Sequence, residues 1–224
     1  MDLCFRDLGR LGYREAYDLQ CAHVEEVLAS RLAGRPQPGF VLFVEHDPVI
    51  TLSRRASASD HLLASEADLR ADGIALEHTD RGGDITYHGP GQLVAYPILD
   101  LEHLRFRLHD YMRFLETVVI RVCDAWDLET RRDPCATGVW VGDAKICAMG
   151  VRVRRWISMH GLALNVTTDL DHFRHIVPCG LHGRTVTSLQ KERGVHDLDE
   201  VRTRMRDAFR TALEERCPDA RSAS

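Results

Sequence analysis

The chain has 224 residues, 44% of them hydrophobic, which is enough to bury a substantial core in one large domain or two small ones. A net charge of -5 argues against nucleic acid as the main partner. No run approaches the roughly 18 consecutive apolar residues of a membrane span, and the first residues carry charges where a signal peptide needs an apolar stretch. We therefore expect a cytoplasmic protein that does not enter membranes.

The first half of the chain mixes helices with short strands. Apolar positions near helical spacing predict a helix over 13–33, which Gly34 and Pro36 end. Ser65, with Asp68 three residues later, resembles a capping box that begins a short helix, and Gly73 ends that helix. Short apolar runs rich in β-branched residues predict strands at 40–44, 49–52, 74–77, 85–87 and 93–98.

The second half predicts a helix over 109–126, three strands and a last helix over 198–216. The strands are expected at 139–141, 145–154 and 157–166, with Gly142 and Asp143 as a hairpin turn. Strands that arrive in hairpin-like groups favour an α+β fold with a mixed, largely antiparallel sheet flanked by helices. Without a repeat or a long linker, a single domain over 1–224 is the economical interpretation.

A segment rich in glycine is the first candidate for function. Four glycines fall in the eleven positions from Arg81 to Gly91, and glycine allows a backbone to approach a ligand closely. The segment lacks the Gly-Lys-Ser/Thr of a P-loop and the spacing of GxGxxG, so a nucleotide phosphate is a poor candidate ligand. From the pattern alone, a pair of glycine-rich turns explains it equally well.

Two reactive side chains stand in suggestive surroundings. Cys179 lies between Pro178 and Gly180 in a segment of turn character, and a cysteine nucleophile needs a nearby cation and access to substrate. Lys145 lies among apolar residues of a predicted strand, where an inward-pointing amine would be paired or have a lowered pKa. Local sequence leaves the alternatives open: a small buried thiol, and an outward-pointing hairpin lysine.

The seven cysteines are odd in number and form no CxxC pair, so most should be free thiols. A zinc site made by His172, His175, Cys179 and His182 is a competing interpretation. A compact set of ligands in one loop with Pro178 among them would hardly reach tetrahedral geometry. Solvated loop histidines are therefore favoured, and no metal is expected.

Several separated motifs carry a family resemblance. RGGDITYHGPGQLVAYPI, GDAKICAMGVRV, HGLALNV and PCGL, in this order and with this spacing, closely resemble the lipoyl(octanoyl) transferases of bacterial lipoate synthesis. The match runs from about residue 45 to 189 and is far more specific than any one motif. It implies a fold like that of the biotin/lipoate protein ligases, with a mixed sheet that cradles a medium-length acyl chain.

The resemblance also implies an activity, that of an acyltransferase in the first step of endogenous protein lipoylation. Octanoyl-acyl carrier protein would donate an octanoyl or lipoyl group. The acceptor would be a specific lysine on the lipoyl domains of 2-oxoacid dehydrogenases or on the glycine-cleavage H protein. Since an amide forms downhill from a thioester, no ATP and no other cofactor is expected.

Carried over by position, the resemblance makes Cys179 the nucleophile that holds the acyl group as a thioester, and Lys145 the residue that lowers its pKa. It also implies three segments that bind substrate and line an acyl pocket. Their residues are Arg81, Gly82, Gly83, Asp84, Ile85, Thr86, Tyr87, His88, Ala148, Met149, Gly150, Gly161, Leu162 and Ala163.

Two positions depart from the family pattern. Ser53 stands where glycine is usual, and Cys147 stands where a small residue without a thiol is usual. Strand alternation would put Cys147 on the same side as Lys145, and we expect it to be a bystander. Two rival functions stay open: an ATP-dependent lipoate or biotin protein ligase of the same fold, and a binding module for acyl carrier or lipoyl domains without catalysis.

Overall fold

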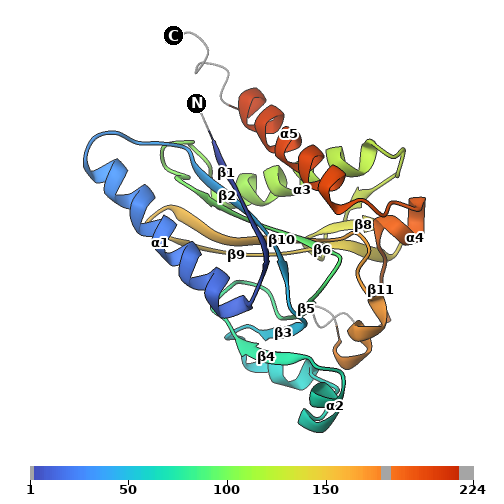
Figure 1. Cartoon of the computed structure of the whole chain (residues 1–224). Helices are drawn as coiled ribbons and strands as arrows, with labels where there is room; N and C mark the ends of the chain where they lie inside the picture. The colour runs from blue at the N-terminus through green and yellow to red at the C-terminus, as the bar shows by residue number, and fades with distance from the viewer. Residues whose placement is uncertain (1–2, 178–182, 217–224) are drawn as a thin grey trace.

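The computed structural model describes residues 3–177 and 183–216, and a large mixed sheet runs through the middle of them (Figure 1). Among these residues eight strands form it. In spatial order they are β1 (Cys4–Leu11), β2 (Gly39–His46), β6 (Gln92–Leu99), β10 (Ile157–Asn165), β9 (Ala144–Arg154), β8 (Val139–Val141) and β7 (Arg131–Arg132), with β11 (Thr185–Val186) also beside β9. Only the β1–β2 and β9–β11 pairs in it are parallel, so the predicted mixed, largely antiparallel sheet is confirmed.

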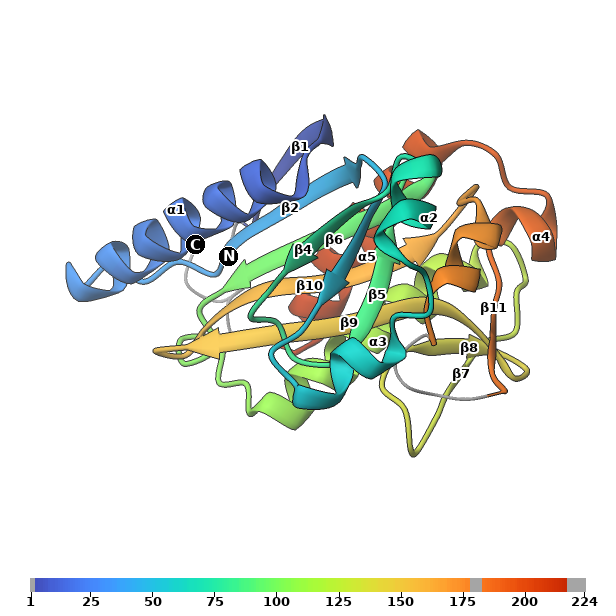
Figure 2. The same cartoon turned by 90° about the horizontal axis from the view of Figure 1, so that it is seen from below.

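A smaller sheet packs below the large one, in the order β4 (Ala75–His78), β3 (Val49–Leu52) and β5 (Ile85–His88), as Figure 2 shows from below. The turn after β2 leads from the large sheet into the small one, and the chain returns between β5 and β6. The small sheet carries the short helix α2 (Glu66–Ala71) and packs with the 3-10 helices η1 (Ala56–His61) and η2 (Leu170–His175).

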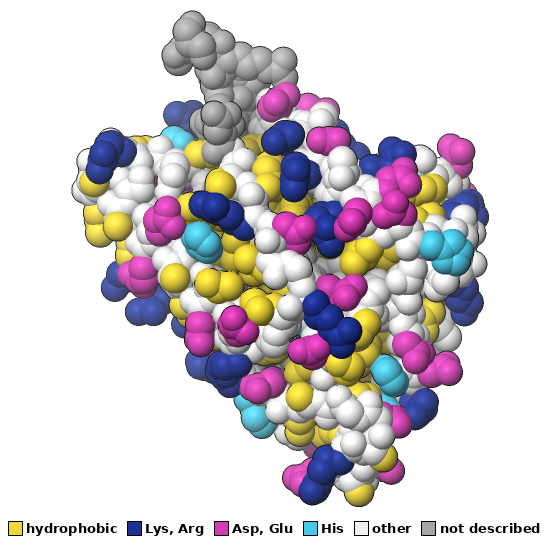
Figure 3. Space-filling view, in the orientation of Figure 1, with side chains coloured by type: hydrophobic (Ala, Val, Ile, Leu, Met, Phe, Trp, Pro, Cys, Tyr) yellow, Lys and Arg dark blue, Asp and Glu magenta, His cyan; other side chains and the backbone are white. Residues whose placement is uncertain are grey.

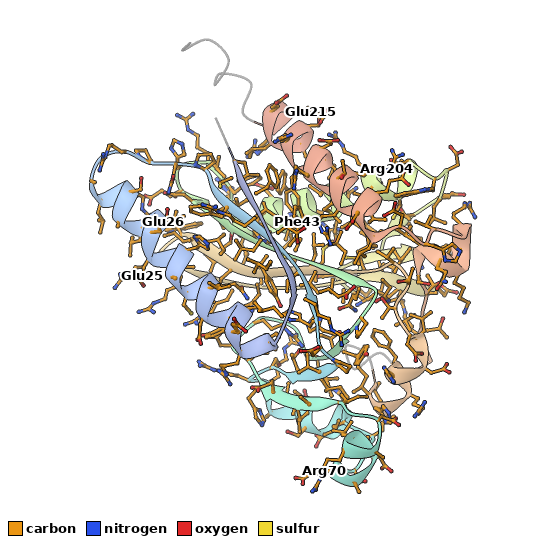
Figure 4. All side chains as sticks on the ribbon, viewed as in Figure 1. Glu25, Glu26, Phe43, Arg70, Arg204 and Glu215 are labelled. Atoms are coloured by element: carbon orange, nitrogen blue, oxygen red, sulfur yellow. The ribbon has the colours of Figure 1, made fainter. Side chains whose placement is uncertain are left out.

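Helices cover both faces of the large sheet. The helix α1 (Tyr13–Leu32) packs on one face, while α3 (Leu108–Asp124) and α5 (Leu198–Arg216) pack together on the other, with the short α4 (Leu189–Arg193) before α5. Buried positions at helical spacing on α3, Tyr111, Leu115, Val118 and Val122, explain why this helix forms against the sheet. Figure 4 shows Phe43 of β2 in the resulting interior, and Glu215 near the outer end of α5.

The predicted helices and strands are present with small shifts at their ends. The capping box is confirmed: the Asp68 N–H donates to Ser65 Oγ over 3.2 Å, and Ser65 N–H donates to Asp68 Oδ2 over 3.0 Å. Gly73 follows α2 in the left-handed conformation, with φ of 65°. The predicted α+β class is confirmed.

Sequence reasoning missed β1, β7, β11 and α4. The strand β1 is an edge strand with several exposed polar side chains, so its composition did not stand out as a strand. The other three elements span two to five residues, too few for a recognisable pattern in the sequence.

None of the described helices is long and apolar enough to cross a membrane. Figure 3 shows side chains of both charge signs interspersed over one face.

Candidate active site

Lys145 is a buried lysine near the start of β9. The turn at Gly142 closes the predicted hairpin between β8 and β9, and its register pairs Lys145 with Trp140; a β-bulge follows and sets Val139 opposite Cys147. Only 5% of the lysine is exposed, and its Nζ lies 4.7 Å from the centroid of the Trp140 ring. Since the face of an aromatic ring attracts a cation, this lysine is held inward rather than at the hairpin surface.

A loop anchored on α3 covers the lysine. A Cβ at Gly138 would lie 2.6 Å from the Cys147 carbonyl oxygen and 3.4 Å from Lys145 Cε, so only glycine allows this close approach. The Gly138 N–H donates to the carboxylate of Glu116 over 3.3 Å. Glu116 is fully buried and also accepts a hydrogen bond from Arg113 over 2.7 Å. The core helix therefore fixes one wall around Lys145.

A second cation lies close to the lysine. The Arg184 guanidinium carbon is 4.7 Å from the centroid of the Trp140 ring, and Arg184 Nη1 donates to Asp133 Oδ2 over 2.5 Å. This hydrogen bond is the main reason that the pKa of Asp133 falls to about 2. The parallel strand β11, which pairs Val186 with Lys145, brings Arg184 to this position. Two positive side chains therefore share one tryptophan.

A groove of about 310 Å³ runs past the lysine. The helix α3 supplies an apolar rim, on which Leu108 is 52% exposed. The groove is lined by Arg55, Gly82, Gly83, Asp84, Leu108, Met112, Cys135, Ala136, Thr137, Lys145, Met149, Gly150 and Val151.

The glycine-rich segment forms the opposite wall by packing directly on β9. The Gly82 N–H donates to the Val151 carbonyl over 2.9 Å, and a Cβ at Gly150 would lie 2.5 Å from the Gly82 oxygen. Ser53, the residue at the unusual position, donates from Oγ to the Gly83 carbonyl over 3.0 Å. Its hydroxyl therefore ties the glycine-rich segment to the end of β3.

A smaller cavity of about 40 Å³ continues from the groove, and the two share Gly83, Asp84, Met149 and Gly150. Twelve of the fourteen predicted substrate-binding residues line this cavity, from all three predicted segments. They are Arg81, Gly83, Asp84, Ile85, Thr86, His88, Ala148, Met149, Gly150, Gly161, Leu162 and Ala163. The structure thus brings together segments that lie far apart in the sequence.

Two residues of the predicted set do not line the cavity. Gly82 lines only the groove. Tyr87 packs into the core of the small sheet, where its ring centroid is 5.5 Å from that of Phe173. Its hydroxyl shares a hydrogen bond of 2.7 Å with His172 Nδ1.

Sequence reasoning missed four cavity-lining residues, Tyr13, Val94, Tyr96 and His160. Three of them, Val94, Tyr96 and His160, belong to the motifs quoted in the sequence analysis. Alternate residues of a strand share a face, so strand alternation could have identified Val94 and Tyr96 together. Tyr13 begins α1, which sequence reasoning treats as a packing helix. Nothing in its local sequence marks it as part of a site.

Two buried histidines near Tyr96, His46 and His88, are uncharged at neutral pH. His46 donates from Nδ1 to the Leu11 carbonyl over 2.9 Å, so its Nε2 accepts from the Tyr96 hydroxyl over 2.7 Å. Burial lowers the pKa of His46 to about 4. His88 donates from Nδ1 to Gln92 Oε1 over 2.7 Å, and burial lowers its pKa to about 3.

The described cysteines, Cys4, Cys21, Cys123, Cys135 and Cys147, are free thiols. Cys147 is fully buried in the main core, and burial raises the pKa of its thiol, which stays protonated. Its Sγ donates to the Ala148 carbonyl over 3.5 Å. Cys179, the predicted nucleophile, lies outside the described residues.

Of the four residues in the zinc alternative, His182 and Cys179 also lie outside the described residues. His175 shares a hydrogen bond of 2.7 Å with Asp72, and His172 bonds Tyr87. Within residues 3–177 and 183–216, no group of three or more His, Cys, Asp or Glu side chains is arranged to hold a metal ion.

Comparison with known proteins gives consistent results. Residues 18–210 match the model of the lipoyl protein ligase A/B catalytic domain. The chain is 44% identical over 206 residues to an octanoyltransferase of Flavobacterium johnsoniae, covering 87% of this chain and 88% of that protein. It is 46% identical over 206 residues to an octanoyltransferase of Solibacter usitatus, covering 92% and 90%.

Among solved structures, the fold resembles that of a bipartite lipoate protein ligase from Thermoplasma acidophilum. The TM-score is 0.71 at 18% sequence identity, over 96% of this chain and 84% of that one. At this identity the likeness concerns the fold alone, and it confirms the predicted fold of the lipoate ligase type.

Proposed function

The chain belongs to the family of lipoyl protein ligase A/B catalytic domains, and on that premise we propose that Cys179 and Lys145 carry out its octanoyl transfer through a thioester intermediate. The activity follows from relatives 44% and 46% identical over most of their length, which are octanoyltransferases. The chain is thus an acyltransferase of protein lipoylation that moves an acyl group from a donor to a lipoyl domain.

The main support for assigning Lys145 to the reaction is that the groove beside it continues into the cavity. A buried amine, Lys145, stands in the groove, and a mostly apolar cavity opens beyond Met149 and Gly150. The cavity, at about 40 Å³, is much smaller than the groove, at about 310 Å³, so we place only the end of the acyl chain in the cavity. The rest of an octanoyl group then lies in the groove, with its carbonyl toward Lys145.

The described residues on either side of 178–182 support Cys179 as the nucleophile. Val177 N–H donates to the His61 carbonyl over 2.8 Å, and the His61 ring bonds Asp84, which lines both groove and cavity. On the other side, Val186 pairs with Lys145. The chain therefore enters and leaves this segment beside the proposed reaction centre.

In the first step the Lys145 ammonium stabilises the Cys179 thiolate, which attacks the carbonyl carbon of the donor thioester. The new sulfur–carbon bond forms as the bond to the donor sulfur breaks. The departing thiolate takes a proton from Lys145. One thioester replaces another, so this step is close to energetic balance.

In the second step the deprotonated amine of the acceptor lysine attacks the acyl-enzyme. The nitrogen–carbon bond forms, the bond to Cys179 sulfur breaks, and neutral Lys145 takes the proton that the amine loses. The thiolate and the ammonium are then restored. Since the amide is more stable than the thioester, the reaction needs no ATP.

For the partners we propose octanoyl-acyl carrier protein as the donor. The acceptors would be lipoyl domains of 2-oxoacid dehydrogenases and the glycine-cleavage H protein. Donor and acceptor must use the same groove in turn, because each brings its reacting atom to Cys179. The exposed Leu108 on the rim gives either protein an apolar contact at the entrance.

Intact-mass measurement after mixing with octanoyl-acyl carrier protein tests the proposal. Wild type should gain one octanoyl group without ATP, Cys179→Ser should not gain a thioester, and Lys145→Met should gain it at least 100-fold more slowly. Cys135→Ser, which removes the exposed thiol of the same groove, is the matched control and should acylate normally. An adduct that survives in Cys179→Ser, or an adduct that requires ATP and free octanoate, refutes it.

A further inference from the structure

His160 has an unusual backbone conformation within β10. Its φ is 56°, in the left-handed region that non-glycine residues seldom adopt in a strand. Strand alternation would place it with Leu162 and Leu164 in the core under α3 and α5. Instead its ring lies toward α1, 5.8 Å between centroids from the ring of Tyr17. The backbone turns this one side chain to the other face of the sheet.

The neighbouring strand explains how this conformation is tolerated. The β6–β10 register, continued from Leu162 opposite Ala95, puts Pro97 opposite His160. Proline has no N–H for the ladder, and the β6–β10 pairing ends before these residues, at Leu162 and Ala95. The His160 N–H donates instead to the Oε1 of the buried Gln20 over 2.8 Å.

The ring of His160 is clamped in place. Its Nε2 donates to Asp80 Oδ1 over 2.8 Å, and Asp80 also accepts from the hydroxyl of Tyr17 over 3.0 Å and pairs with Arg152. The residue is 1% exposed. A ring held by both a carboxylate and a fixed backbone has little freedom to move away from a ligand.

His160 lines the cavity, and it does so at the end away from Lys145. The groove that holds Lys145 meets the cavity at Gly83, Asp84, Met149 and Gly150. His160 is among the residues that line the cavity and not the groove. In the β9–β10 pair it lies opposite Val151, six residues along β9 from Lys145, which places it toward the inner end of the cavity, away from the lysine.

We propose that His160 closes the inner end of the acyl cavity and sets the longest acyl chain that the enzyme accepts. This rests on the proposed acyl transfer and adds the residue that determines chain length. Within the described part of the chain, Nδ1 of His160 is buried without a hydrogen-bond partner. A longer apolar chain would clash with this fixed ring, and its methylenes could not form a hydrogen bond with the unpaired nitrogen. Its extra carbons would therefore add no binding free energy.

His160→Gly is the decisive variant, because glycine adopts a φ of 56° readily and the backbone need not move. Removal of the ring makes room for further methylenes. Each buried methylene is worth about a factor of four in affinity, so two more carbons raise the preference for decanoyl over octanoyl about 15-fold. His160→Asn, which also tolerates this conformation, should give a smaller rise.

The measurement is the ratio of decanoyl to octanoyl adduct formed from the two acyl-carrier proteins, followed by intact mass. His78→Gly removes an exposed imidazole from β4 and is the matched control, with the wild-type ratio expected. Melting curves establish that each variant is folded. A ratio in folded His160→Gly within twofold of wild type overturns the proposal.

Binding of the free acids separates this inference from the proposed function. Calorimetry with octanoic and decanoic acid needs no acyl transfer, and the affinity ratio should shift toward decanoic acid in His160→Gly by the same factor. An absent adduct with a shifted affinity ratio would refute the transfer mechanism alone. A normal octanoyl adduct with an unshifted ratio refutes the role of His160 alone.

Discussion

Gly150→Ala should disable the enzyme because the added methyl group would clash with the backbone of the glycine-rich segment. Gly150 lies on β9 where the glycine-rich segment crosses it, and it lines both the groove and the cavity. A Cβ there would lie 2.5 Å from the Gly82 carbonyl oxygen. Because the oxygen belongs to backbone, no side-chain rotation can relieve the contact.

The size of the effect follows from that distance. An ordinary contact begins near 3.4 Å, so the segment at Gly82 must retreat by about 0.9 Å. This breaks the hydrogen bond from Gly82 to Val151, worth about 1 kcal/mol, and adds about 1–3 kcal/mol of overpacking. A displacement near 1 Å at a reacting site costs about 100-fold in rate.

Two assays should show both effects. Urea unfolding should give a loss of about 2–4 kcal/mol, and octanoyl adduct formation should slow about 100-fold. Gly12→Ala is the matched control, since its Cβ meets nothing within 4 Å and its φ of -61° suits alanine. Gly150→Ala with wild-type stability and acylation would show that the close approach of the glycine-rich segment to β9 is unimportant.

Three further predictions follow from the same contacts. Ser53→Gly loses the hydrogen bond to Gly83 and should cost about 1 kcal/mol in urea unfolding; an unchanged midpoint would contradict the tether. Cys147→Ala should still form the octanoyl adduct and lose about 1 kcal/mol or more of stability, whereas loss of the adduct would make this thiol more than a bystander. His46 has a pKa of about 4 in the fold against 6.5 ordinarily, so below pH 6.5 the unfolded chain binds a proton that the fold excludes. Stability should fall by about 3 kcal/mol more in wild type than in His46→Gln between pH 7.5 and 4.5; equal losses would contradict a neutral buried imidazole paired with Tyr96.

Much of the fold was within reach of the sequence. Periodicity places α3 and α5, because each has an apolar face at helical spacing long enough to be distinctive. The apolar face of α1 is weaker, and Gly34 and Pro36 help to mark where that helix ends. The capping box at Ser65 is recognisable because the interaction is local. The edge strand β1 is not, since its partner lies a whole helix away in the chain.

The candidate site also has parts that local sequence predicts and parts that depend on distant residues. Separated motifs predict the three segments that meet at the cavity, and Lys145 is buried, which is one of the two orientations that its local sequence left open. The inner end is different, because the direction of the His160 ring depends on Pro97 in another strand and on Gln20 in a helix. The sequence around His160 contains no pattern that predicts the direction of its ring.

The position of α5 has a consequence for synthesis. Its buried side chains, among them Val201, Met205 and Phe209, complete the main core against α3, although they come near the end of the described chain. A ribosome therefore releases β2, β6 and β10 before α5, one of the two helices that cover this face, exists. During that interval a broad apolar surface is open to water, and we expect nascent chains of this protein to depend on chaperones more than its size alone suggests.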